Sequence, residues 1–225
     1  MQEARRDIWT PLAGVLAALT FFFGLLFVAD GPGNNDPDAK VLAWYADHGH
    51  RLQQIIGVYL LAFCGLFLIW FAAGLRQRLR AAEGPGGRLS NIALAGATLC
   101  AGMLWIGAAA AVAVSGAKSV GGVAGPQTAD VARFLPHVGY AAILIFAMFG
   151  AIAMIDAASI VALRTGILPR WLVWLGFVCA IVLLFGLAFL PVIAFPIWLL
   201  AASVVLFRLP AFEAEPVTVV SKPAS

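Results

Sequence analysis

The chain alternates between long apolar runs and short polar segments. Crossing the hydrocarbon core of a bilayer takes about 20 predominantly apolar residues in a helix. Six stretches meet or approach this length, at about 11–29, 52–75, 90–115, 134–164, 170–189 and 191–207. The pattern predicts an all-α integral membrane protein, in which residues 1–208 form one domain, a six-transmembrane-helix bundle. The polar, proline-containing residues 209–225 are predicted to be a disordered tail.

Glycine and proline residues divide the second half of the chain into helices. Gly166 is expected to end the fourth span and Pro169 to begin the fifth, a connection so short that the two helices should be antiparallel neighbours. The apolar run 170–208 is too long for one span, so we place a break at Pro191, which gives a helical hairpin. Pro196 leaves open a kinked or partly re-entrant second arm.

Two further patterns concern helix packing. The third span carries the small residues Ala93, Ala97 and Ala101 at a spacing of four, which favours close approach of two helices. In the fourth span, Pro136 is expected to produce a kink near the membrane surface, because proline cannot donate a backbone hydrogen bond.

The segment between the first two spans has a different periodicity. Its apolar positions share one helical face: Val41, Leu42, Trp44 and Tyr45. Its polar positions share the other face: Asp38, Lys40, Asp47 and His48. This predicts a short interfacial amphipathic helix, with its aromatic residues at the level of the lipid headgroups.

Composition supports a membrane protein and excludes a soluble domain. Hydrophobic residues make up 63% of the chain and charged residues 11%, whereas soluble domains contain about 25% charged residues. The formal net charge is only +3, and the basic residues lie beside the predicted spans. We therefore expect the lipid bilayer, and no nucleic acid, as the partner of these charges.

The distribution of basic residues predicts the orientation. With a cytoplasmic amino terminus, six spans place ten of the 14 Lys and Arg residues in cytoplasmic segments: Arg5, Arg6, Arg76, Arg78, Arg80, Arg88, Arg164, Arg170, Arg208 and Lys222. The other four fall in outer segments: Lys40, Arg51, Lys118 and Arg133. This positive-inside bias predicts a multi-pass protein of the plasma membrane with both termini in the cytoplasm.

Three motifs resemble a known family. They are VLAWYADHGHR (41–51), LRQRLRAAEG (75–84) and LRTGILPRWLVWLGF (163–177). Together they resemble a broad family of six-pass actinobacterial integral membrane proteins that carries only a domain-of-unknown-function label. The resemblance implies a polytopic protein of the bacterial inner membrane. It implies no established activity and no catalytic residue.

Asp156 is the charged residue that lies deepest in an apolar run. A charge at membrane depth costs about 2.5–3.5 kcal/mol on insertion scales, so such residues usually face protein or a water-filled cavity. Ser159, one helical turn away, can donate a hydrogen bond to the carboxyl group. Asp156 is thus a candidate general acid, proton carrier or cation partner. The alternatives are a protonated residue that joins helices, or a carboxylate that reaches Arg164 through water.

Other candidate residues are aromatic or imidazole side chains. Trp105 and Trp198 can line a pocket for a flat apolar ligand, or simply pack against other helices. Tyr140 is a weak ligand-binding candidate on the predicted outer side, which also holds the three histidines of the chain: His48, His50 and His137. Their spacing fits no metal-binding signature, so we predict no metal site and no cofactor. The three cysteines fall within spans without metal-ligand spacing.

These observations leave three functions open. The first is a small transporter-like or lipophile-binding module centred on Asp156. The second is an intramembrane enzyme acting on a prenyl or other lipid substrate, with Asp156 as a general acid in the manner of small terpenoid cyclases. The third is an accessory subunit of a larger membrane complex, or a homo-oligomer. A small lipophilic ligand is the expected partner in the first two cases.

Overall fold

The computed structural model describes residues 8–33, 35–119 and 128–209, and these form helices without any strand. The elements are α1 (Trp9–Ala29), α2 (Asp38–Ala46), α3 (His48–Glu83), α4 (Arg88–Ser119), α5 (Ala129–Ala141), the π-helix η1 (Ala142–Ala147), α6 (Met148–Thr165), α7 (Arg170–Leu183), the 3₁₀-helices η2 (Gly186–Ala188) and η3 (Leu190–Ile193), and α8 (Ala194–Arg208). The all-α prediction is confirmed. The predicted tail, apart from Leu209, lies outside the described residues.

Five helices in the described ranges are long and apolar enough to cross a membrane. They are α1, α3, α4, the continuous helix Ala129–Thr165 and the helix Leu190–Arg208. The chain is therefore a helical membrane protein. By contrast, α7 has only 14 residues, about 21 Å at 1.5 Å per residue, against a hydrocarbon core of about 30 Å. It ends at Leu183, before the predicted boundary at 189, so the count of six spans stays a prediction.

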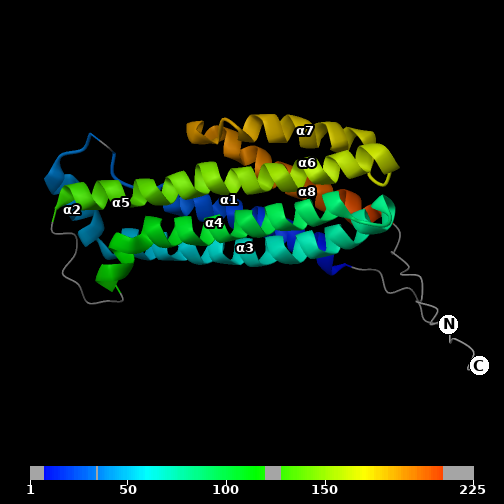
Figure 1. Cartoon of the computed structure of the whole chain (residues 1–225). Helices are drawn as coiled ribbons and strands as arrows, with labels where there is room; N and C mark the ends of the chain where they lie inside the picture. Colours follow the sequence, from blue (N-terminus) through cyan, green and yellow to red (C-terminus); the bar gives the residue numbers. More distant parts are fainter. Residues whose placement is uncertain (1–7, 34, 120–127, 210–225) are drawn as a thin grey trace, which may run out of the picture.

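The long helices lie side by side along one axis (Figure 1). The start of α1 and the end of α8 lie toward the same end of the bundle, where α4 and α7 also begin. At the opposite end, α2 lies beside the start of α5; we call this the α2 end. The α7–α8 hairpin turns back before it reaches the α2 end (Figure 1).

The apolar face of α2 packs on protein. Val41 and Tyr45 are buried in a small cluster with Val114 of α4 and with Ala129 and Ala132 of α5. The amphipathic pattern of this segment therefore has a partner within the bundle. Its position at a membrane interface stays a prediction.

Helix α4 packs backbone to backbone against the helix Ala129–Thr165 at two levels. A Cβ atom on Gly150 would lie 2.5 Å from Cys100 N and 2.7 Å from Gly96 O. Nearer the α2 end, a Cβ atom on Gly139 would lie 2.5 Å from Gly107 O. Real Cβ atoms do not come this close to backbone, so these positions require glycine.

The helix that contains Pro136 stays helical on both sides of this residue. Its irregular segment is instead η1, which begins six residues later. Gly186, in the turn of the α7–α8 hairpin, packs against the carbonyl oxygen of Leu144 in η1 so closely that a Cβ atom would overlap it. The hairpin turn therefore sits directly on the π-helical segment.

We predict that Gly150→Ala destabilises the protein by about 1–3 kcal/mol, because the added methyl group meets backbone atoms that cannot move independently. The matched control is Gly102→Ala on α4, where an added Cβ atom meets nothing within 4 Å. That control should be neutral or slightly stabilising, since alanine favours helix more than glycine does. Thermal unfolding in detergent, followed by circular dichroism, measures both. Equal melting temperatures for the two variants would contradict the packing described for α4.

Candidate functional site

Asp156 lies on a face of α6 that points away from the bundle. Its side chain is half-buried. Phe149 and Leu163, seven residues before and after it and so on the same face, are 55% and 52% exposed. Among the described residues, Asp156 has no hydrogen-bond or ion-pair partner. The carboxyl group therefore shares a helix face with exposed apolar side chains, and its candidate roles stay predictions.

Ser159 points in another direction, toward α7. It is buried, and a methyl group on Gly176 of α7 would overlap its hydroxyl oxygen. Trp198 of α8 is 1% exposed, and its Nε1 would lie 3.1 Å from the same methyl group. Neither Ser159 Oγ nor Trp198 Nε1 has a hydrogen-bond partner among the described residues. Two predicted site residues thus meet at Gly176, without Asp156.

Trp105 lies apart from both, on the surface of α4 beside α3. The indole is 43% exposed, and its Nε1 donates a hydrogen bond of 3.0 Å to the backbone oxygen of Ala62. The ring covers Gly65 of α3, where a Cβ atom would overlap it. This hydrogen bond and this contact fix the indole across the two helices.

Beside the Trp105 ring is a groove of about 390 Å³, which we call the α3–α4 groove. Its lining residues are almost wholly apolar: Val58, Tyr59, Ala62, Phe63, Leu66, Trp105, Ala108 and Ala109. The bulky members are exposed to the surroundings of the bundle, with Tyr59 at 63% and Phe63 at 50%. Sequence reasoning identified Trp105 but missed Tyr59 and Phe63. The available signal was the pair Ala108–Ala109, whose small side chains leave space opposite larger residues.

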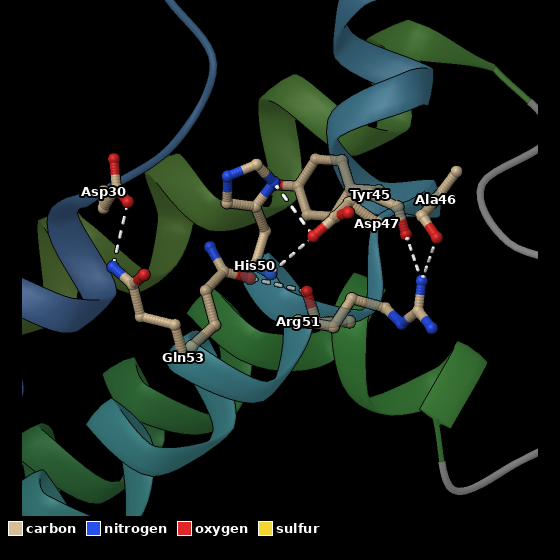
Figure 2. A network of polar contacts seen from close by, with 9 residues as sticks. Asp30, Tyr45, Ala46, Asp47, His50, Arg51 and Gln53 are labelled. Carbon is tan, nitrogen blue, oxygen red and sulfur yellow. Dashed lines mark hydrogen bonds and ion pairs between the residues drawn. The ribbon is translucent and has the colours of Figure 1, made fainter.

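The polar side chains at the α2 end hold the α2–α3 corner in place (Figure 2). The Asp47 carboxylate accepts a 3.0 Å hydrogen bond from the backbone N–H of His50 and so caps the start of α3. This bond lowers the pKa of Asp47 below its usual value. Arg51 donates to the backbone oxygens of Tyr45 and Ala46, which are at the end of α2. Burial raises the pKa of Tyr45 to about 12.

At the α2 end of the bundle, two glutamines join the ends of the long helices. Gln53 donates a 2.9 Å hydrogen bond to Asp30, just after α1 (Figure 2). The Ser115 hydroxyl of α4 donates a 2.5 Å bond to the side-chain oxygen of the buried Gln54. These polar residues therefore connect α1, α3 and α4 to each other, which is a structural role.

The three histidines do not converge. His48 is exposed, whereas the ring of His50 stacks on Trp44 with centroids 4.7 Å apart. His137 lies on α5, where its Nδ1 donates to the backbone oxygen of Arg133 at 2.6 Å. Within residues 8–33, 35–119 and 128–209, no group of three His, Cys, Asp or Glu side chains is placed to hold a metal ion.

Tyr140 lies near His137, and their ring centroids are 5.9 Å apart. Its hydroxyl donates a 2.8 Å hydrogen bond to the backbone oxygen of Val28, which ties α5 to the end of α1. Tyr140, His137 and Arg133 line a small pocket of about 180 Å³ together with Tyr45. Each of these four side chains already donates a hydrogen bond to a backbone carbonyl oxygen: Tyr45 donates to Ala132, and Arg133 donates to Asp36.

Comparison with known proteins adds no relative. No protein-family model, no curated protein and no solved structure matches the chain. The likeness of residues 41–51, 75–84 and 163–177 to a six-pass actinobacterial family stays an expectation from the sequence. Two surfaces of the described residues combine exposure with an unusual feature: the α3–α4 groove, and the outward face of α6 with its unpaired carboxyl group.

Proposed function

We propose that this protein is a membrane-embedded lipophile-binding module, and that the α3–α4 groove holds an apolar chain of its ligand. The observation that carries the proposal is the groove itself. Its volume of about 390 Å³ lies within the range of about 300–1,000 Å³ typical of small-molecule sites, and its lining is almost wholly apolar. It opens sideways between two helices that are long enough to span a bilayer.

The groove is suited to the apolar chain of a lipid because one of its walls is rigid. Trp105 is held by its bond to Ala62 O and cannot rotate into the groove without leaving that carbonyl. Aromatic side chains offer a large contact area and lose little conformational freedom on binding. Acyl or prenyl chains are the apolar molecules that a bilayer supplies, so they are the proposed ligand class.

The geometry favours lipophile binding in the groove over a transporter-like mechanism and over a cyclase-like enzyme, both of which would depend on Asp156. A transporter-like mechanism needs a polar centre inside the bundle, whereas Asp156 lies on the outward face of α6. A cyclase-like enzyme needs the acid close to the aromatic residues that would shield a cationic intermediate. Trp198 is in the core at Gly176, and Trp105 is on α3–α4, so neither adjoins Asp156 in the way that chemistry requires.

We further propose six passes with both termini in the cytoplasm, and α2 at the outer interface. The support is that the α7–α8 hairpin returns the chain to the end where it started, because α7 begins and α8 ends at the same end of the bundle (Figure 1). The residues at these two helix ends are Arg170 and Arg208. Both charges then obey the positive-inside rule. A short α7 is compatible with a pass through a locally thin membrane.

Filling the groove should weaken ligand binding. We expect Ala109→Phe to reduce affinity for cis-parinaric acid, a fluorescent fatty acid, by about tenfold, or about 1.4 kcal/mol. The reason is that Ala109 is an exposed residue that lines the groove, so a benzyl group there occupies the space without disturbing the core. Energy transfer from tryptophan to the bound fatty acid, titrated in detergent, measures the affinity.

The matched control for this experiment is Ala95→Phe. Ala95 is also an exposed alanine of α4 but does not line the groove. Its variant should bind the fatty acid as the parent protein does. If both variants bind as tightly as the parent, the groove is not the binding site and the proposed function fails.

The proposed topology predicts a labelling pattern. In a background that lacks the three native cysteines, single cysteines at Lys118 and at Leu190 should react with an impermeant maleimide on intact cells. Leu190 is 72% exposed in the hairpin turn. A cysteine at Arg80 should react only after the cells are opened. If the cysteine at Arg80 is labelled on intact cells, the orientation is opposite to the proposed one. If the cysteine at Lys118 is labelled and the one at Leu190 is protected, the hairpin is re-entrant.

A further inference from the structure

The outward face of α6 has the pattern of a helix-packing surface, although no helix of the described chain covers it. It consists of Phe149, Ile152, Asp156, Ile160 and Leu163, each of which is exposed or half-buried. These positions recur at spacings of three, four, four and three residues. This is the spacing of a seam along which two helices pack side by side, in membranes as in coiled coils.

The described part of the chain does not satisfy the carboxyl group at the middle of this seam. Ser159 is directed toward α7, and Arg164 lies about 12 Å further along the helix axis. On the neighbouring α7, the outward positions are the apolar residues Trp174, Val178 and Ile181. Asp156 would therefore be in contact with acyl chains, which is an unfavourable environment for a carboxyl group.

A second copy of this chain is a poor partner for Asp156. All Lys and Arg residues lie outside the central parts of the spans, so a copy brings no cation to this depth. A two-fold axis along the seam would instead place a second Asp156 opposite the first. Two carboxyl groups side by side cannot both be ionised, so such a pair would have to share a proton and lose a charge. A single polar residue at a seam position, in contrast, typically selects its partner and fixes its register.

We propose that the outward face of α6 is the docking surface for a transmembrane helix of a different protein, which carries one Lys or Arg at the depth of Asp156. An ammonium or guanidinium group would supply the charge and the hydrogen-bond donors that the carboxylate lacks. The flanking residues Phe149 and Leu163 would contact apolar residues about two turns on either side. This inference does not depend on ligand binding in the α3–α4 groove.

The test uses the full-length protein in phosphatidylcholine vesicles with synthetic transmembrane peptides as probes. One leucine- and alanine-rich peptide has a single Arg about 12 Å from the cytoplasmic end of its apolar segment, matching the distance from Asp156 to Arg164. A second peptide has Gln at the same position. Energy transfer between labelled protein and labelled peptide reports association. We expect the Arg peptide to associate about tenfold more tightly than the Gln peptide.

Variants of the protein make the result specific. Asp156→Asn keeps the size of the side chain but removes its charge, so the preference for Arg should disappear. Asp130→Asn, a control at a carboxylate that is 94% exposed in the first turn of α5, should keep the preference. Circular dichroism establishes that both variants remain helical. Binding of cis-parinaric acid should be unchanged in Asp156→Asn, which separates this proposal from the proposed function.

Two outcomes would overturn the proposal. One is equal association of the Arg and Gln peptides with the parent protein, including no association of either. The other is energy transfer between two labelled copies of the protein that Asp156→Asn abolishes, which would make the seam a contact between identical chains.

Discussion

The direct backbone contact between α4 and α6 is the constraint on which the rest of the bundle depends. Gly150 must face Gly96 and Cys100, because any side chain there would collide with their backbone atoms. That requirement fixes the rotation of α6 about its own axis. At about 100° per residue, Asp156 then lies about 240° around the helix from Gly150, and Ser159 about 180°. The contact therefore turns the acid outward and the serine toward α7.

Helix rotation is also where sequence reasoning reached its limit. In a bilayer both the lipid-facing and the core-facing sides of a helix are apolar, so hydropathy identifies a span but not its buried face. The all-helical class and the helix boundaries at Gly166 and Pro169 could be predicted, whereas the direction of Asp156 could not. The small residues Ala93, Ala97 and Ala101 are buried as the pattern suggested, but the glycines beside them make the closest contacts. The sequence suggested both Trp105 and Trp198 as pocket residues, but the two lie at separate places. Hydropathy could not show this, because it does not reveal which face of each helix is buried.

The α7–α8 hairpin shows why the predicted boundary at 189 and the observed end of α7 differ. Residues 184–193 are nearly all apolar, so hydropathy continues through them as if the helix did. The backbone nevertheless turns, at Phe189 with a φ of 68°, a conformation that a non-glycine residue rarely adopts. Successive 3₁₀-type bonds, such as Ala188 N–H to Phe185 O and Val192 N–H to Phe189 O, keep backbone groups paired through the turn. The turn therefore leaves few backbone groups without a hydrogen-bond partner, although the helix is interrupted there.

The two surfaces for which a role is proposed both lie on the sides of the bundle. One side of α4 forms the α3–α4 groove with Trp105 and Ala109, and another side holds α6 in the rotation that exposes Asp156. Neither feature leads through the bundle, where side chains such as Leu104 and Met154 are completely buried. A concave apolar site and an unpaired carboxyl group that both open sideways are suited to binding molecules and helices that diffuse in the plane of the bilayer.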